Sequence, residues 1–132
     1  MNLGNLYSMK STFDKIIHYS FENPILSFEL MRYVKKVDEY FDFLQKELNK
    51  IIANFSKDNI FDVDNLTEEE KEQYNEKINS LLNMPVHIIE KFPLTTADFQ
   101  KSVNPNNKDY WLSAQDFLII EQLYNNEEKS GD

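Results

Sequence analysis

The sequence has no cysteine and only two glycines, Gly4 and Gly131. The lack of cysteine excludes disulfide bonds, cysteine-ligated zinc, iron–sulfur clusters and thiol nucleophiles. The lack of glycine between residues 5 and 130 excludes the G-x-G-x-x-G turn and the P-loop, because both motifs bring the backbone close to phosphates through internal glycines. Nucleotide binding by either motif is therefore excluded.

Long apolar runs are also absent, and none approaches the ~20 residues of a membrane-spanning helix. The N-terminal segment MNLGNLYSMKSTFDK lacks a basic stretch followed by an apolar one, which is the pattern of a secretion signal. We therefore expect no membrane binding and a cytoplasmic location.

What is present is a chain of 132 residues, of which 41% are hydrophobic and 28% are charged. This composition is typical of one globular domain. We expect a single helical domain over residues 1–126, followed by a polar tail over residues 127–132.

Negative charge is concentrated in the middle of the chain. The net charge is −9, and residues 56–83 carry three basic and eight acidic groups. Such a field repels the phosphates of nucleic acids and attracts basic protein surfaces. We therefore expect no direct binding of DNA or RNA, and a protein partner with a basic surface.

The apolar pattern predicts a long helix from about Pro24 to Phe55. Spacings of three and four residues form a heptad seam, and a further apolar set extends this stripe towards the N-terminus. At 1.5 Å per residue, ~32 residues span ~48 Å, which is more than a compact core of this size covers. The helix is therefore expected to pack with the other helices, with a second subunit or with a partner. The seam consists of Val37, Phe41, Leu44, Leu48, Ile51 and Phe55, and its extension of Ile25, Phe28, Met31 and Val34.

Capping boxes predict the remaining helices. Thr67 and the three glutamates after it predict a helix that runs to about Asn83. The segments Leu94–Phe99 and Leu112–Phe117 both contain a hydroxyl residue, an aspartate three residues later and a flanking leucine and phenylalanine. This repeated capping box with a hydrophobic staple predicts a short helix and a longer one.

One strand signal completes the expected fold. Val86–Phe92 lies between two prolines and is predicted to pair with Asp109–Leu112 as a minimal two-stranded ribbon. The expected fold is mainly α, with a long central helix packed with two other major helices, one or two short helices and this ribbon.

No catalytic or metal-binding motif is found. In a calcium loop counted from Asp58, Ile60 and Val63 stand where an oxygen ligand and a glycine are needed. His18 and His87 are the only imidazoles, they lie 69 residues apart, and the chain has no nucleophile elbow. We therefore expect no enzyme, no metal site and no cofactor.

Two sets of residues are candidates for partner binding. Six carboxylates lie in the acidic segment, and three of them, Glu68, Glu72 and Glu76, recur every four residues and so form one row on a helix. Tyr110 and Trp111 are adjacent aromatic residues of the kind that anchors interfaces. The simpler interpretations are a solubilising face and ordinary core packing. The carboxylates are Asp62, Asp64, Glu68, Glu69, Glu72 and Glu76.

The amino-acid bias and the order of features along the chain point to a viral gene. Thirteen lysines against one arginine, with fifteen asparagines and eleven isoleucines, indicate A/T-rich codons. A resemblance to a known group rests on three segments between Pro24 and Tyr124, which are FLQKELNKIIANF, LTEEEKEQYNEKINSLLNMPVHI and LSAQDFLIIEQLY. The chain resembles short, uncharacterised helical proteins encoded by tailed phages and prophages of low-GC Gram-positive bacteria. The resemblance implies expression in a bacterial host cell and carries over no functional residue.

Small acidic phage proteins act as virion or assembly components, or as inhibitors that occupy a host defence protein, sometimes by imitating DNA. With the charge distribution above, we expect a non-enzymatic module that binds a basic surface of a target protein. The most specific version of this expectation is an inhibitor of a host defence nuclease or another nucleic-acid-binding protein. The alternative is a phage structural or assembly protein that forms a homodimer through the long helix.

Overall fold

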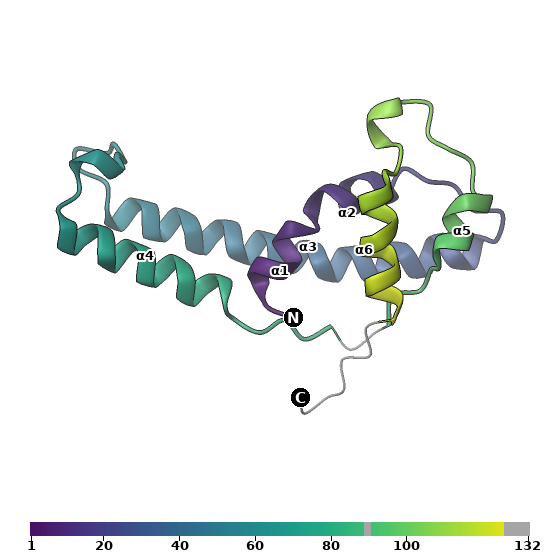
Figure 1. Ribbon diagram of the computed structural model, residues 1–132, viewed down its shortest axis with the longest axis horizontal. Helices are drawn as coiled ribbons and strands as arrows, with labels where there is room; N and C mark the ends of the chain where they lie inside the picture. The colour runs from purple at the N-terminus through teal and green to yellow at the C-terminus, as the bar shows by residue number, and fades with distance from the viewer. Residues whose placement is uncertain (89–90, 126–132) are drawn as a thin grey trace. The chain divides into compact units, whose positions relative to one another are not determined.

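The computed structural model describes residues 1–88 and 91–125, and most of these are helical (Figure 1). The mainly α class and the long helix predicted from the sequence are confirmed, while the predicted tail over residues 127–132 lies outside the described residues. The helices are α1 (Leu3–Ser8), α2 (Lys10–Ile16), α3 (Pro24–Asn54), α4 (Glu68–Leu82), α5 (Thr96–Lys101) and α6 (Ala114–Asn125), and the 3₁₀ turns are η1 (Val63–Asn65) and η2 (Lys108–Tyr110).

The described residues form two compact units, and α3 contributes one half to each of them. The first unit consists of Met1–Tyr7 and Glu39–Val86, and it contains most of α1, the second half of α3, η1 and α4. The second unit consists of residues 8–38 and the described residues of 87–125, and it contains α2, the first half of α3, α5, η2 and α6.

In the first unit, the N-terminal segment is bound to the end of α4. The Leu3 N–H donates to the Met84 carbonyl at 2.9 Å, and the Val86 N–H donates to the Met1 carbonyl at 3.0 Å. The side chains of Leu3 and Leu6 are buried, so this segment supplies part of the core of the first unit.

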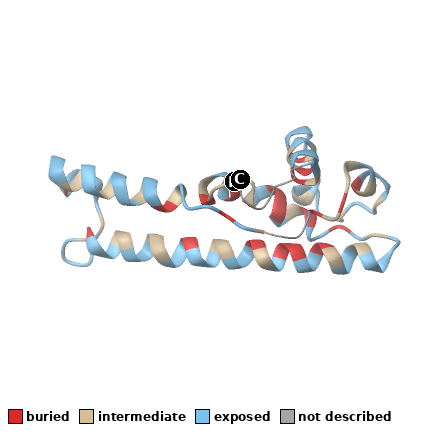
Figure 2. Cartoon of the chain, turned by 90° about the horizontal axis from the view of Figure 1, so that it is seen from below, coloured by how far each residue is buried: buried red, intermediate tan, exposed pale blue. Residues whose placement is uncertain are grey.

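Helix α4 runs back beside the second half of α3 (Figure 1). Large rings make the contact: Phe55 and Tyr74 meet edge to face with centroids 5.6 Å apart, and Phe61 lies 5.2 Å from Tyr74. Only Leu81 is buried among the fifteen residues of α4, and Figure 2 shows the helix exposed along most of its length. α4 is therefore held mainly from one side and leaves its other faces in solvent.

In the second unit, the core is built from aromatic side chains. Phe13, Phe92 and Phe99 are almost fully buried. The Tyr33 ring of α3 stacks on Phe13 with centroids 6.3 Å apart and meets Phe92 edge to face at 5.1 Å. The Tyr19 ring meets Phe99 in the same edge-to-face manner at 5.7 Å. These contacts join α2, α3 and α5 into one core.

The repeated capping box is confirmed in both places. Thr95 Oγ1 accepts from the Asp98 N–H at 3.2 Å, and Asp98 Oδ2 accepts from the Thr95 N–H at 2.8 Å, at the start of α5. Ser113 Oγ and Asp116 Oδ2 form the same pair of bonds, at 3.2 and 2.8 Å, at the start of α6. These side chains satisfy backbone N–H groups that a helix start leaves without carbonyl partners.

The predicted apolar stripe of α3 is wrong in its N-terminal part. Val37, Leu44 and Phe55 of the seam are buried and its other members are half-buried, but Ile25, Phe28 and Met31 are more than half exposed. Successive steps of three residues turn about 60° short of a full rotation, so a stripe at 25, 28 and 31 moves around the helix away from the seam. Val34 of the predicted extension is buried as expected, and the other buried positions of α3 before Val37 are Leu30 and Tyr33.

The predicted two-stranded ribbon is not confirmed. Residues 108–110, at the start of its second strand, form η2, because the Asn107 side chain accepts from the Asp109 N–H at 2.9 Å and closes a 3₁₀ turn. Of the first strand, residues 89–90 lie outside the described residues. The described residues contain isolated bridges only, such as Ser20 with Val103.

Candidate functional site

A tight turn positions the acidic segment before α4. Asp58 and Asn59 both adopt left-handed backbone angles, with φ of 55° and 63°. Lys57 and Ile60 exchange two backbone hydrogen bonds across them, at 2.9 and 3.0 Å. Aspartate and asparagine tolerate this conformation better than most residues, so the turn is encoded locally.

Asp62 and Asp64 belong to the next turn. Asp62 Oδ1 accepts from the Asp64 N–H at 3.0 Å and caps η1, and both side chains are exposed. Asp62 therefore has a structural role in ordering the loop, whereas Asp64 is in solvent with no role in the core.

The predicted capping box at the start of α4 is confirmed. Thr67 Oγ1 accepts from the Glu70 N–H at 3.1 Å, and Glu70 Oε1 accepts from the Thr67 N–H at 3.0 Å. Lys57 Nζ donates to Glu70 at 3.1 Å and to the Asn65 carbonyl at 2.9 Å. The bond from the Thr67 N–H, followed by that from Lys57, lowers the pKa of the Glu70 carboxyl. Lys57 is thus engaged by Glu70 and leaves the neighbouring carboxylates uncompensated.

The acidic row, defined as Glu68, Glu72 and Glu76, lies on α4 with all three residues exposed, as is Glu69. Lys71 Nζ lies 3.5 Å from Glu68 Oε1, and so exposed a pair contributes little. Among residues 1–88 and 91–125, the structure records no ion-pair partner for Glu69, Glu72 or Glu76. The predicted carboxylates therefore lie together in the first unit, and most of them are available to a partner.

A groove of about 490 Å³ begins where the acidic row ends. It lies between α3 and α4, and Glu76 is both the last member of the row and part of the groove wall. The sequence pattern does not predict this groove, although Phe43 stands outside the heptad seam and is a signal for it. Its lining consists of Phe43, Glu47, Ile51, Glu76, Lys77, Ser80, Leu81 and Met84.

Tyr110 and Trp111 lie in the second unit, whereas the acidic row belongs to the first. The Tyr110 ring stacks on His18 with centroids 3.7 Å apart, which fixes η2 against the end of α2. Trp111 is 44% exposed, and its Nε1–H donates to the Pro105 carbonyl at 2.8 Å. Lys108 Nζ lies over the Trp111 ring at 5.7 Å. Tyr110 is thus largely structural, while one side of Trp111 remains accessible.

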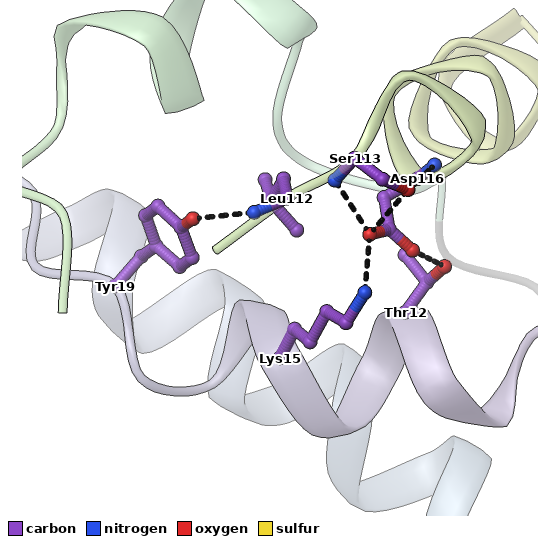
Figure 3. Close-up of polar contacts among 6 residues, drawn as sticks. All are labelled: Thr12, Lys15, Tyr19, Leu112, Ser113 and Asp116. Carbon is purple, nitrogen blue, oxygen red and sulfur yellow. Dashed lines mark hydrogen bonds and ion pairs between the residues drawn. The ribbon is translucent and has the colours of Figure 1, made fainter. Parts of the chain in front are cut away.

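Asp116 is a buried carboxylate in the second unit, and the sequence predicts its capping role but not its bonds to α2. Asp116 is 4% exposed, and besides its capping bonds it accepts from Thr12 Oγ1 at 2.6 Å and from Lys15 Nζ at 2.7 Å (Figure 3). Burial raises the pKa of Asp116, but the bonds from Lys15, Ser113 and Thr12 outweigh it and hold the pKa below its ordinary value. The cluster ties α2 to α6.

A tyrosine hydroxyl extends this cluster. Tyr19 Oη accepts from the Leu112 N–H at 2.9 Å, beside the Ser113 cap (Figure 3). Because each polar atom drawn there has at least one partner within the protein, we assign the cluster a role in folding.

The second unit also carries an apolar groove of about 500 Å³. Ile17 and Met31 are among its lining residues, and both are more than half exposed, as are Ile25 and Phe28 on the first half of α3. Ile25, Phe28 and Met31 form an apolar face of α3 that the described part of the second unit leaves uncovered.

The described part of the chain contains no candidate metal site and no candidate membrane-spanning helix. Within the described ranges, no three histidine, aspartate or glutamate side chains are grouped so that they could hold a metal ion. None of the helices described has both the length and the apolar character that crossing a membrane requires.

Comparison with known proteins gives no family for this chain: no protein-family model, curated protein or solved structure matches it.

Proposed function

We propose that this protein is a non-enzymatic binding module whose acidic surface on α4 and the preceding loop engages a basic surface of a partner protein. The observation that carries the proposal is the exposure of α4: it buries only Leu81 and presents Glu68, Glu72 and Glu76 in one row. Glu69 and Asp64 add to the same acidic surface.

The stability of α4 explains only the first member of the row: Glu68 lies in the first turn, where a carboxylate interacts favourably with the helix dipole, whereas Glu72 and Glu76 lie beyond that turn. Glutamates spaced four residues apart repel each other and cost a helix a few tenths of a kcal/mol per pair. Glu70, by contrast, caps the helix and pairs with Lys57, so it has a structural role. A charged row without such a role supports a function outside the chain, in which it attracts a cationic surface and speeds association.

The sharpest form of the proposal is a phage-encoded inhibitor that acts in the cytoplasm of a bacterial host. Successive members of the row are separated by a rise of about 6 Å along the helix. A line of negative charges imitates the phosphates of DNA, and the preferred target is then a defence nuclease or another nucleic-acid-binding protein. The same charge makes direct binding of nucleic acid unfavourable.

The test replaces Glu68, Glu72 and Glu76 together with glutamine. Wild type and variant are used to capture proteins from a low-GC Gram-positive bacterium, and association with the captured protein is then timed over a range of salt concentrations. We expect the variant to associate about tenfold more slowly, with little change in dissociation, because steering acts on the encounter. We also expect the affinity of wild type to fall as salt rises.

The matched control replaces three exposed glutamates outside this surface, Glu22, Glu39 and Glu121, with glutamine, which changes the net charge by the same amount. This control is expected to associate at nearly the wild-type rate. A row variant that binds as fast as wild type, with no salt dependence, refutes the proposal and moves attention to Trp111 or α3.

The uncovered face of α3 favours a second candidate, a structural or assembly protein that self-associates through its long helix. Ile25, Phe28 and Met31 are more than half exposed on that helix, and exposed apolar patches mark interaction sites. For this candidate, sedimentation velocity is expected to give a dimer that Met31→Asp converts to a monomer. A wild-type monomer at all accessible concentrations excludes it.

A further inference from the structure

The α3–α4 groove combines apolar lining residues with one glutamate from each helix. Leu81 is buried at its base, whereas Phe43 and Met84 are 38% and 41% exposed. Glu47 from α3 and Glu76 from α4 line it from the two helices. The groove lies wholly within the first unit.

The cations at and beside the groove are already engaged by the protein itself. Lys77, the one cation among the lining residues, has its Nζ over the Phe55 ring at 5.6 Å, and Lys50, which lies outside the lining, pairs with Glu47 at 3.2 Å. Glu76 has no recorded ion-pair partner within residues 1–88 and 91–125. Lys50 thus compensates Glu47, and the negative charge that remains available at the groove is that of Glu76, which the acidic row continues along α4 in steps of four residues.

The apolar part of the groove is suited to a side chain from another molecule. Single exposed apolar residues are common, but Phe43, Ile51 and Met84 converge on one concave site of about 490 Å³. This volume lies in the range of about 300–1,000 Å³ that is usual for binding pockets. Methionine adapts its shape to different partners, which suits a wall that receives a foreign side chain.

We propose that the groove takes an amphipathic, basic segment of the partner, with a large apolar side chain between Phe43 and Met84 and lysines or arginines directed at Glu76 and the row beyond it. This inference rests on the function proposed above and names the chemistry of the occupant. A partner helix with cations every four residues matches the row, because both repeat with a rise of about 6 Å.

The probe is a synthetic helix-forming peptide of about four turns, with lysines every four residues on one side and a tryptophan beside them. Binding to the full-length protein is measured by fluorescence anisotropy, and the site is located by NMR shifts of backbone amides. We expect the largest shifts at Phe43, at Met84 and along α4, including Ser80 in the groove. A second peptide with alanine in place of tryptophan is expected to bind at least about tenfold more weakly, because it buries nothing in the groove.

Variants of the protein also test whether the tryptophan of the peptide enters the groove. Phe43→Ser and, independently, Met84→Ser are expected to weaken binding of the tryptophan peptide about tenfold and to leave the alanine peptide unaffected. Both residues are partly exposed, so both variants should fold, as circular dichroism will show. The matched control is Phe28→Ser, an exposed phenylalanine of α3 outside the groove.

The outcomes separate this inference from the function on which it rests. If the tryptophan and alanine peptides bind equally well, or if Phe43→Ser and Met84→Ser bind the tryptophan peptide like wild type, the groove inference is overturned. In that case, loss of binding in the triple glutamine variant still supports the acidic surface. A wild-type dimer that Phe43→Ser converts to a monomer assigns the groove to a second copy of this chain and likewise overturns the inference.

Discussion

Replacing Asp116 with alanine is expected to lower the free energy of unfolding by about 3 kcal/mol. The side chain accepts hydrogen bonds from Thr12, Lys15 and Ser113 while almost fully buried, so its removal leaves several donors without an acceptor. The Lys15 ammonium, itself mostly buried, loses its counter-charge. Urea denaturation followed by circular dichroism measures the change.

The repeated capping box supplies a matched control. Asp98 occupies the same position in the first turn of α5 and makes the same two capping bonds, but no bond recorded among the described residues joins it to another helix. Asp98→Ala is therefore expected to cost only about 1 kcal/mol, the usual effect of a lost cap. Equal effects of the two substitutions would show that the bonds from Thr12 and Lys15 contribute nothing to stability.

The pH dependence of the same cluster follows from the lowered pKa of Asp116. In the unfolded chain the carboxyl titrates near 3.8, and in the folded protein it titrates at lower pH. Its contribution is therefore complete above the unfolded pKa and is lost as pH falls through the folded pKa. The stability difference between wild type and Asp116→Asn should accordingly shrink below about pH 4. A difference that grows on acidification would contradict this assignment.

The same cluster shows how far the sequence alone could lead. The capping bonds between Ser113 and Asp116 belong to a local pattern of four residues, which the sequence predicts. The bonds from Thr12 and Lys15 are not predicted, because they join positions about a hundred residues apart, and no spacing in the sequence encodes which side chain of α2 meets the start of α6.

For the long helix α3, too, the sequence predicts only part of the buried side correctly. Spacings of four and three residues identified the buried side at Val37 and Leu44, since that pattern stays on one face of a helix. Steps of three residues led to the wrong prediction that Phe28 and Met31 are buried, because residues at that spacing leave the buried face of a helix within two steps. At the candidate site, the acidic row followed from spacing alone, whereas the groove depends on how α4 pairs with α3, which brings Phe43 and Met84 to one site.

Leu44→Ala is expected to cost about 2–5 kcal/mol, since it removes a side chain that is only 2% exposed and leaves a cavity. Leu44 lies one turn beyond Phe41, whose ring meets Tyr7 of α1 edge to face at 6.1 Å, so it belongs to the side of α3 that faces the first unit. Because α1 and α4 are short or largely exposed, this unit has few other large core residues, and the cavity cannot be filled by rearrangement at low cost.

The control for this substitution is Leu48→Ala on the same seam. Leu48 is half-buried, so the loss should be no more than about 2 kcal/mol. Urea midpoints of both variants, measured with wild type at one protein concentration, give the comparison. Equal losses at the two positions would mean that Leu48 is covered by something absent from the described chain, and a second copy is the first candidate. An unchanged urea midpoint for Leu44→Ala would show that the seam is not part of the core. A leucine packed on all sides cannot lose three carbon atoms without a measurable loss in the free energy of unfolding.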